Sequence, residues 1–344
     1  MLPNPLRYVS VQESATSFLN NTGCISLANS GNISTRNGYN VRLLDAEVVD
    51  YDVLRGWLNY CGIHHAKQCA ITSIATLPSL QVIDCDLRAI TDLPDGFEFL
   101  ALSYVWGVPT RNFSADRSDP GSALSEEIPQ VIRDAITVTK NLGFRYLWVD
   151  RYCISSNNTI KHEQIKNMDI VYRAAHATII AVAGEDPTFG LPGVSSRARN
   201  AQPHARIGMK LLASTLPNPH VSIIRSKWAS RAWTYQECLL SRRRVFFTSE
   251  QVYFECQSMH CCEAVSAPLD AIHTPSKERL RISITDGLYP LHGLGKSPQD
   301  IWTRITEYTR RSITYESDTL NGMLGLLRAF SERETPVYHL WGVP

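Results

Sequence analysis

A helix-forming segment in the second half of the chain places an aromatic ring and a carboxylate on one face. Residues 227–240 are KWASRAWTYQECLL, in which Trp233 and Glu237 lie four positions apart. Residues with this spacing share one face of a helix. A buried aromatic ring beside a carboxylate indicates either a packed helix with a solvated acid at its edge or a functional site.

Further side chains suited to chemistry follow the apolar segments that we interpret as strands. In an open parallel sheet, ligands bind beyond the carboxyl ends of the strands. The residues at these ends are Ser103, Tyr104, Trp106 and Gly107, then Asp150, Arg151 and Cys153, then Gly184, Glu185 and Asp186. Arg231 and Trp233 begin the helix that carries Glu237. Together these residues predict a ligand site at one edge of a sheet.

Each of these residues also has a structural explanation. Trp106 and Trp233 are of a type that more often packs in a core, and Asp150 could cap the helix that follows it. Glu237 could form an ion pair with Arg231 or with one of the arginines at 242–244. Both interpretations stay open on the sequence alone.

The elements that must position these side chains alternate between strands and helices. Apolar strands are predicted at 98–106, 146–154 and 177–184, and helices at 129–143, 161–175 and 230–240. Residues 244–256 form one more strand or a hairpin. Alternation of this kind, with strands buried on both faces, is typical of parallel βαβ units. We therefore expect an α/β fold with a doubly wound parallel sheet at residues 97–256.

The remaining segments flank or interrupt this domain. Residues 1–40 are rich in Asn, Ser and Gly and predict a disordered or loop-like lead. Residues 41–96 predict a helix capped by Asp50 and a short strand at 81–85. The proline-rich stretch 187–226 is predicted to be an insertion with its own hairpin, made from 205–213 and 220–226. Residues 257–344 predict a helical extension whose last apolar residues pack on the body.

Composition narrows the class of protein. The net charge of +1 over 344 residues gives no basic surface for nucleic acid, and nine cysteines are too few for a disulfide scaffold. The N-terminus has no apolar run typical of a signal peptide, and no stretch approaches the ~18 apolar residues that span a membrane. We expect a cytoplasmic protein without a membrane span.

Three ordered motifs resemble the signature segments of the fungal heterokaryon incompatibility (HET) domain. They are ALSYVWG, YLWVDRYCI and SRAWTYQE, and the resemblance extends from about residue 97 to about residue 256. In the family, the second motif usually continues with an acidic or amide residue shortly after the isoleucine. Here the residues after Ile154 are Ser155, Ser156, Asn157 and Asn158, and this is the one visible departure. The resemblance implies self/non-self recognition and programmed cell death in a fungus, through self-assembly or a protein partner.

The HET family is also considered a distant relative of the Toll/interleukin-1 receptor (TIR) fold, which is flavodoxin-like. Enzymatic members of that fold cleave NAD with a glutamate on the third helix, in a Trp-Cys-Leu-x-Glu segment. Here Trp233 and Glu237 keep that spacing, but Thr234 and Tyr235 replace the Cys and Leu. The resemblance thus implies an alternative function, a TIR-like NAD glycohydrolase with Glu237 as catalytic carboxylate and a nucleotide as ligand.

Physical chemistry supports Glu237 in that alternative independently. Cleavage of the nicotinamide–ribose bond releases a neutral group from a cation, so no general acid is needed. The transition state resembles an oxocarbenium ion, which one fixed carboxylate can stabilise. Tyr104 and Trp106 could stack on the ring of a base or of nicotinamide. NAD would be a substrate, and no resident cofactor is expected.

Other motifs are excluded by their spacing. Gly295-Lys296-Ser297 lacks the earlier glycine of a phosphate loop, since position 290 is Pro290. The segments CGIHHAKQC (61–69) and CQSMHCC (256–262) could join as a zinc site, but neither has regular finger spacing. Cys61 is explained as a core residue of its helix. The sequence therefore predicts no metal site.

Overall fold

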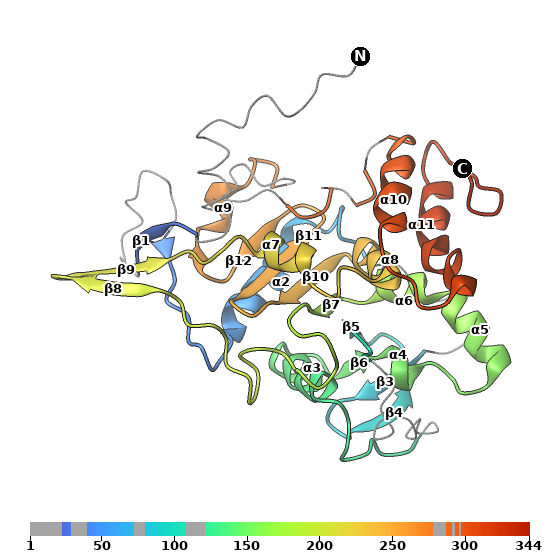
Figure 1. Cartoon of the computed structure of the whole chain (residues 1–344), viewed down its shortest axis with the longest axis horizontal. Helices are drawn as coiled ribbons and strands as arrows, with labels where there is room; N and C mark the ends of the chain where they lie inside the picture. Colours follow the sequence, from blue (N-terminus) through green and yellow to red (C-terminus); the bar gives the residue numbers. More distant parts are fainter. Residues whose placement is uncertain are drawn as a thin grey trace.

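The computed structural model describes residues 23–28, 40–71, 80–107, 121–277, 287–290, 293–295 and 297–344. Its centre is one sheet of eight strands: β3 (Gln81–Asp84), β4 (Ala89–Asp92), β5 (Phe99–Ser103), β6 (Tyr146–Trp148), β7 (Ala177–Ala181), β10 (Arg243–Phe247), β11 (Val252–Cys256) and β12 (His260–Cys262). Their spatial order is β12-β11-β10-β7-β5-β6-β3-β4 (Figure 1). The predicted α/β class is confirmed.

The sheet is mixed and not wholly parallel. The four inner strands, β6-β5-β7-β10, are parallel to one another. At one edge, β3 pairs antiparallel with β6 and with β4. At the other edge, β11 pairs antiparallel with β10 and with β12. Since β3 and β4 precede residue 97 and β12 follows residue 256, the sheet extends beyond the segment of the predicted domain on both sides.

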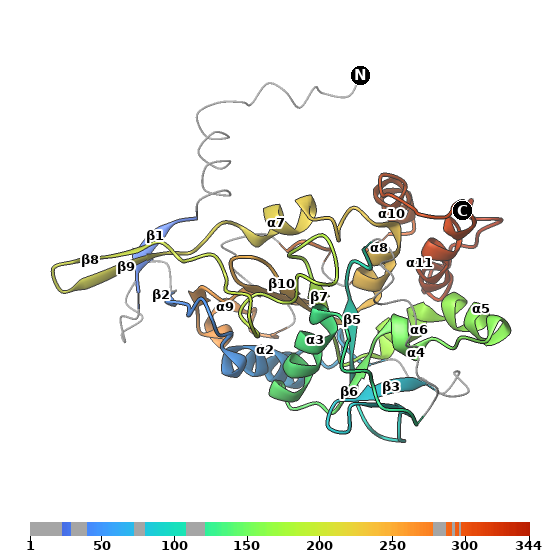
Figure 2. The same cartoon turned by 60° about the horizontal axis from the view of Figure 1, so that its bottom comes forward.

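Helices cover both faces of the sheet. They are α2 (Tyr51–His64), α3 (Gln130–Asn141), α4 (Asp150–Cys153), α5 (Asn158–Lys166), α6 (Met168–Ala174), α7 (Pro219–Arg225), α8 (Ala232–Leu240), α9 (Leu269–Ile272), α10 (Asp300–Thr309) and α11 (Asn321–Ser331). Val245 of β10 belongs to the same core cluster as Trp57 of α2, whereas the next residue, Phe246, belongs to a cluster with Cys238 of α8. Figure 2 shows α2 and α3 on one side and α7, α8 and α10 on the other.

The C-terminal helices bury the outer face of α8. Tyr235 and Leu239 of α8 pack in one cluster with Leu326 and Phe330 of α11. Close approach of α11 depends on Gly325, because a Cβ atom there would lie 2.3 Å from the Cβ of Asp169. Helix α8 is thus enclosed between the sheet and the C-terminal extension.

Several local predictions are confirmed. Helix α2 buries Leu54, Trp57, Leu58 and Cys61, and the Asp50 side chain caps it by accepting from the backbone N–H groups of Asp52 and Val53. The insertion does contain a hairpin, which pairs with β1 (Ile25–Leu27), but both of its strands, β8 (His204–Ile207) and β9 (Lys210–Ser214), come from the first of the two segments predicted to form it. Two short strands, β2 (Asn40–Val41) and β13 (Val265–Ser266), pair beside it. The other residues of the predicted lead, 1–22 and 29–39, lie outside the described residues.

Other predictions are wrong in detail. Residues 220–226 form α7 and not a strand, because the Asn218 side chain caps a helix with Pro219 at its first position. The second predicted strand ends at Trp148, and Asp150 begins the short helix α4. The predicted helix 161–175 is interrupted at Asn167, between α5 and α6. Of the last apolar residues, Val337 packs against the cluster of α8, α10 and α11, but those after it do not, since Trp341 is 84% exposed.

No helix among the described segments combines the length and apolar character needed to cross a membrane.

Candidate functional site

The carboxyl group of Glu237 lies in a buried hydrogen-bond network beyond the end of β5. Its Oε2 atom accepts a hydrogen bond from the Ser103 Oγ at 2.5 Å. The Ser103 Oγ in turn accepts from Nε1 of Trp228 at 2.8 Å. The Tyr172 hydroxyl donates to the Leu102 carbonyl at 3.2 Å and also lies within hydrogen-bond reach of Glu237. Glu237 therefore joins α8 to β5 and α6.

A second pair of side chains lies beside this network. Nε1 of Trp106 donates to Oδ2 of Asp150 at 2.8 Å, and the backbone N–H of Arg151 donates to Oδ1 at 2.7 Å. The Arg151 guanidinium carbon lies 5.4 Å from the centroid of the Trp106 ring. On the other side, the Arg231 guanidinium donates to the Tyr104 carbonyl at 3.0 Å. These contacts hold the chain after β5 against the start of α8.

Burial and a neighbouring carboxylate alter the protonation of Glu237. Glu237 is only 5% exposed, and this burial, followed by the nearby Asp150 carboxylate, raises the pKa of Glu237 to about 7. Hydrogen bonds from Ser103 and Tyr172 and the charge of Arg231 act in the opposite direction. Burial also raises the pKa of Asp150. Near neutral pH, Glu237 is therefore a group that exchanges a proton and not a fixed negative charge.

The structure brings most of the predicted site residues together. Ser103 and Glu237 are in direct contact, Trp106 and Asp150 form a second contact, and Tyr104, Arg151 and Arg231 line the same region. Trp233 is half-buried and packs against the main core cluster. Gly107 has a φ of +71°, and a Cβ atom there would lie 2.9 Å from Pro187, so it serves a tight turn.

The alternative of an ion pair for Glu237 has no support among the described residues. None of their salt bridges involves Glu237. Arg243 donates to Cys61 and to the His176 carbonyl, and Arg244 donates to the carbonyls of Glu255 and Cys238. The carboxyl group is satisfied by neutral donors instead.

Two cavities in the described part of the chain lie elsewhere. One, of about 430 Å³, is lined by Trp148, Cys153 and Glu163, and the other, of about 680 Å³, by Tyr235, Tyr289 and Arg311. Neither is lined by Ser103, Asp150 or Glu237. The network is therefore not a wall of either of these two cavities.

Sequence reasoning missed two members of the network. Tyr172 lies within the predicted helix 161–175 and is not among the predicted site residues, yet its hydroxyl approaches both Leu102 and Glu237. Trp228 lies five residues before Trp233, and its indole N–H is bound to Ser103. A buried Tyr or Trp needs a partner for its polar atom, which is the one signal that could have identified them.

Comparison with known proteins places this region in a family. Residues 99–237 match the family model described as "Heterokaryon incompatibility protein (HET)". The chain is also 25% identical over 247 residues to "Vegetative incompatibility protein HET-E-1" of Podospora anserina. That alignment covers 70% of this chain and 15% of the relative, so the chain matches a small part of a much longer protein. No solved structure matches the chain.

Proposed function

This chain is a HET domain protein, and from that premise we propose that it is an effector of heterokaryon incompatibility that triggers programmed cell death in a fungus. The match of residues 99–237 supports the incompatibility role. We propose that the effector acts in the cytoplasm through self-assembly or docking to a protein partner. The burial of Glu237, at 5% exposure, favours this mode over catalysis by its carboxylate.

Exposed apolar side chains support a role in docking. In the C-terminal segment, Tyr338, Leu340, Trp341 and Val343 are between 65% and 84% exposed. Apolar groups gathered on a surface are typical of protein–protein contacts, where burial removes them from water. A second copy of the chain, or a partner protein, would supply that burial.

The assembly mode predicts that induced proximity is sufficient for death. The full chain, fused to a drug-controlled dimerisation module, is expressed in a fungal host at a level that cells tolerate. Addition of the drug should then cause a loss of viable cells of at least about tenfold. The dimerisation module alone is the control. Unchanged viability after dimerisation, at verified protein levels, would exclude assembly as the trigger.

A second candidate function, cleavage of NAD, is favoured by the position of the network. The order of the four parallel strands, β6-β5-β7-β10, is that of the first four strands of flavodoxin-like sheets, in which ligands bind where the order reverses. Ser103 ends β5, one of the two strands at that reversal, and Glu237 contacts it. A TIR-like ancestry would give the same arrangement. With a pKa of about 7, Glu237 would be only partly ionised near neutral pH, and the positive charge of bound NAD would favour its ionised form.

Release of nicotinamide separates the two candidates. Purified full-length protein is incubated with NAD, and free nicotinamide is followed by chromatography. If Glu237 is the catalytic carboxylate, the wild-type protein releases nicotinamide and Glu237→Gln is slower by about 10²–10³, the loss typical of one electrostatic group. Wild-type protein that releases no more nicotinamide than buffer would remove this candidate.

A further inference from the structure

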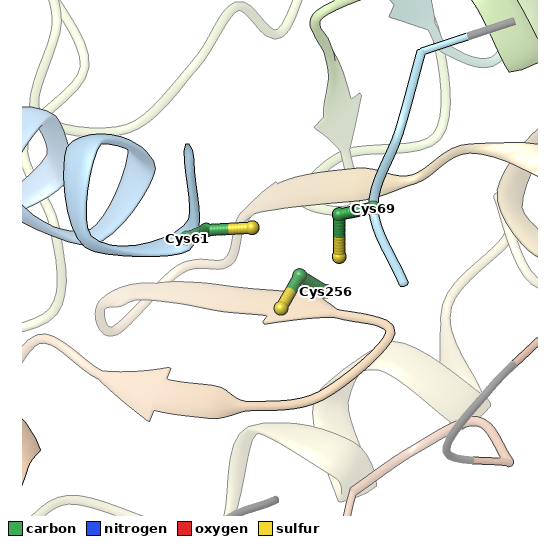
Figure 3. A group of neighbouring side chains, drawn as sticks. All are labelled: Cys61, Cys69 and Cys256. Atoms are coloured by element: carbon green, nitrogen blue, oxygen red, sulfur yellow. The ribbon is translucent and has the colours of Figure 1, made fainter. Parts of the chain in front are cut away.

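Three thiols from distant parts of the chain gather on the face of the sheet opposite α8. Cys61 lies in the last turn of α2, Cys69 in the loop after it, and Cys256 at the end of β11 (Figure 3). Their sulfur atoms all lie within 4.8 Å of one another, and each residue is at most 1% exposed. None of the three forms a disulfide.

His65 adds a nitrogen atom to the same cluster. Its Nδ1 lies 3.5 Å from the Cys256 Sγ, and the side chain is completely buried. An imidazole that binds a metal through one nitrogen usually donates its other N–H to an acceptor. The backbone of Lys277 interacts with this same ring and could supply such an acceptor.

Several hydrogen-bond donors surround the sulfur atoms. The backbone N–H groups of Ser258 and Met259 point at the Cys256 Sγ, at 3.4 and 3.3 Å. Nε of Arg243 donates to the Cys61 Sγ at 3.1 Å. Hydrogen bonds of this kind orient sulfur ligands around a metal.

The charges of the cluster balance when one divalent cation is included. Three thiolates, a neutral imidazole and a cation of charge 2+ carry a net charge of about −1. The guanidinium of Arg243, 4% exposed and in contact with Cys61, supplies the compensating positive charge. Without the cation, either thiolates or a guanidinium would remain poorly compensated in the interior.

The ligand set and its dimensions point to one metal. With bonds of about 2.3 Å to sulfur and 2.0–2.1 Å to nitrogen, a tetrahedral zinc site has S···S separations of about 3.8 Å and S···N separations of about 3.6 Å. The 3.5 Å contact between Nδ1 of His65 and the Cys256 Sγ fits this geometry, and the sulfur atoms need only a small approach. The imidazole is not within 4.8 Å of all three sulfur atoms, so it must move toward at least one of the other two when the metal binds. A set of three thiolates and one imidazole is typical of structural zinc.

We propose that Cys61, Cys69, Cys256 and His65 bind one structural zinc ion. The site fastens α2 and its loop to the β10–β11 hairpin, and all four ligands lie outside the family match at 99–237. Binding replaces up to three thiol protons, which are released to solvent. Because four protein ligands complete the tetrahedron, the site is closed and has no catalytic position. This proposal departs from the sequence analysis, in which irregular spacing excluded a metal.

Metal content tests the proposal directly. The full chain, purified without a histidine tag, should contain about one zinc per chain by elemental mass spectrometry. Cys69→Ser and Cys256→Ser should each lose at least about 80% of that zinc. The matched control is Cys262→Ser, close in sequence to Cys256 but outside the cluster, which should keep its zinc.

A second measurement tests the zinc site even if these variants do not fold. X-ray absorption at the zinc edge of the wild-type protein should show about three sulfur neighbours and one nitrogen neighbour. Wild-type protein that contains no zinc, and takes up none from an equimolar zinc solution, would overturn the proposal. So would zinc retained in full by Cys69→Ser and Cys256→Ser, or a disulfide between two of the three cysteines in the freshly purified protein.

Discussion

Replacing Arg199 by methionine is expected to lower the free energy of unfolding by about 3–5 kcal/mol. The Arg199 guanidinium contacts the Glu263 carboxylate at 2.5 Å, and the two side chains are 1% and 0% exposed. It also donates to the backbone carbonyls of Asp45 and Val48, which joins the insertion to the N-terminal segment. Methionine fills a similar volume but leaves the Glu263 charge buried without its partner.

An exposed ion pair provides the control for this prediction. Arg55 and Asp52 form a pair one turn apart on α2, with side chains 45% and 88% exposed. Arg55→Met should therefore cost at most about 1 kcal/mol. Both variants are measured by denaturant unfolding of the full chain. Equal costs for Arg199→Met and Arg55→Met would show that burial of the Arg199–Glu263 pair has no energetic importance.

Replacing Glu237 by glutamine is expected to make stability less dependent on pH. The folded pKa of Glu237 is raised from 4.5 to about 7, so the unfolded chain loses this proton first as the pH rises. Wild-type stability should therefore fall between about pH 4.5 and pH 7, by roughly 3 kcal/mol from this group alone. Glutamine mimics the protonated carboxyl group and has no proton to lose in this range.

The measurement compares the free energies of unfolding of the two proteins from about pH 4 to about pH 8. Glu237→Gln should be close to the wild type at the acidic end and more stable at the basic end, by up to about 3 kcal/mol. Glu127→Gln, which replaces an exposed carboxylate, is the control and should show no such trend. A constant difference between Glu237→Gln and the wild type at every pH would contradict the raised pKa.

The sequence predicts those elements whose apolar period is long enough to be specific. The spacing of Leu54, Trp57, Leu58 and Cys61 predicts α2, and Asp50 marks its start. Short apolar runs are less informative, because a buried strand and a buried helix look alike over a few residues. For this reason the segment after Trp148 is wrongly predicted as strand, although Asp150 begins a helical turn.

The candidate site is predictable in its main residues but not in its chemistry. Ser103, Asp150 and Glu237 are found from their positions at strand and helix ends, since parallel strands bring their carboxyl ends together. The burial of Glu237 depends on its tertiary contacts with Ser103 of β5 and Tyr172 of α6, for which the residues near Glu237 carry no local signal. The thiol cluster also depends on tertiary structure, because Cys256 and Cys61 approach each other only after the sheet is assembled.

The central claim is that this HET domain protein acts through assembly. Its most direct test is the cell death induced by the Glu237→Gln variant. The variant and the wild-type chain are fused to the drug-controlled dimerisation module, and viability is counted at matched protein levels. If assembly is the trigger, the variant should kill as many cells as the wild type within a factor of about two, because its fold and surface are retained. A variant that folds, is at least as stable as the wild type and leaves the cells alive would contradict the account and assign the activity to the carboxylate of Glu237.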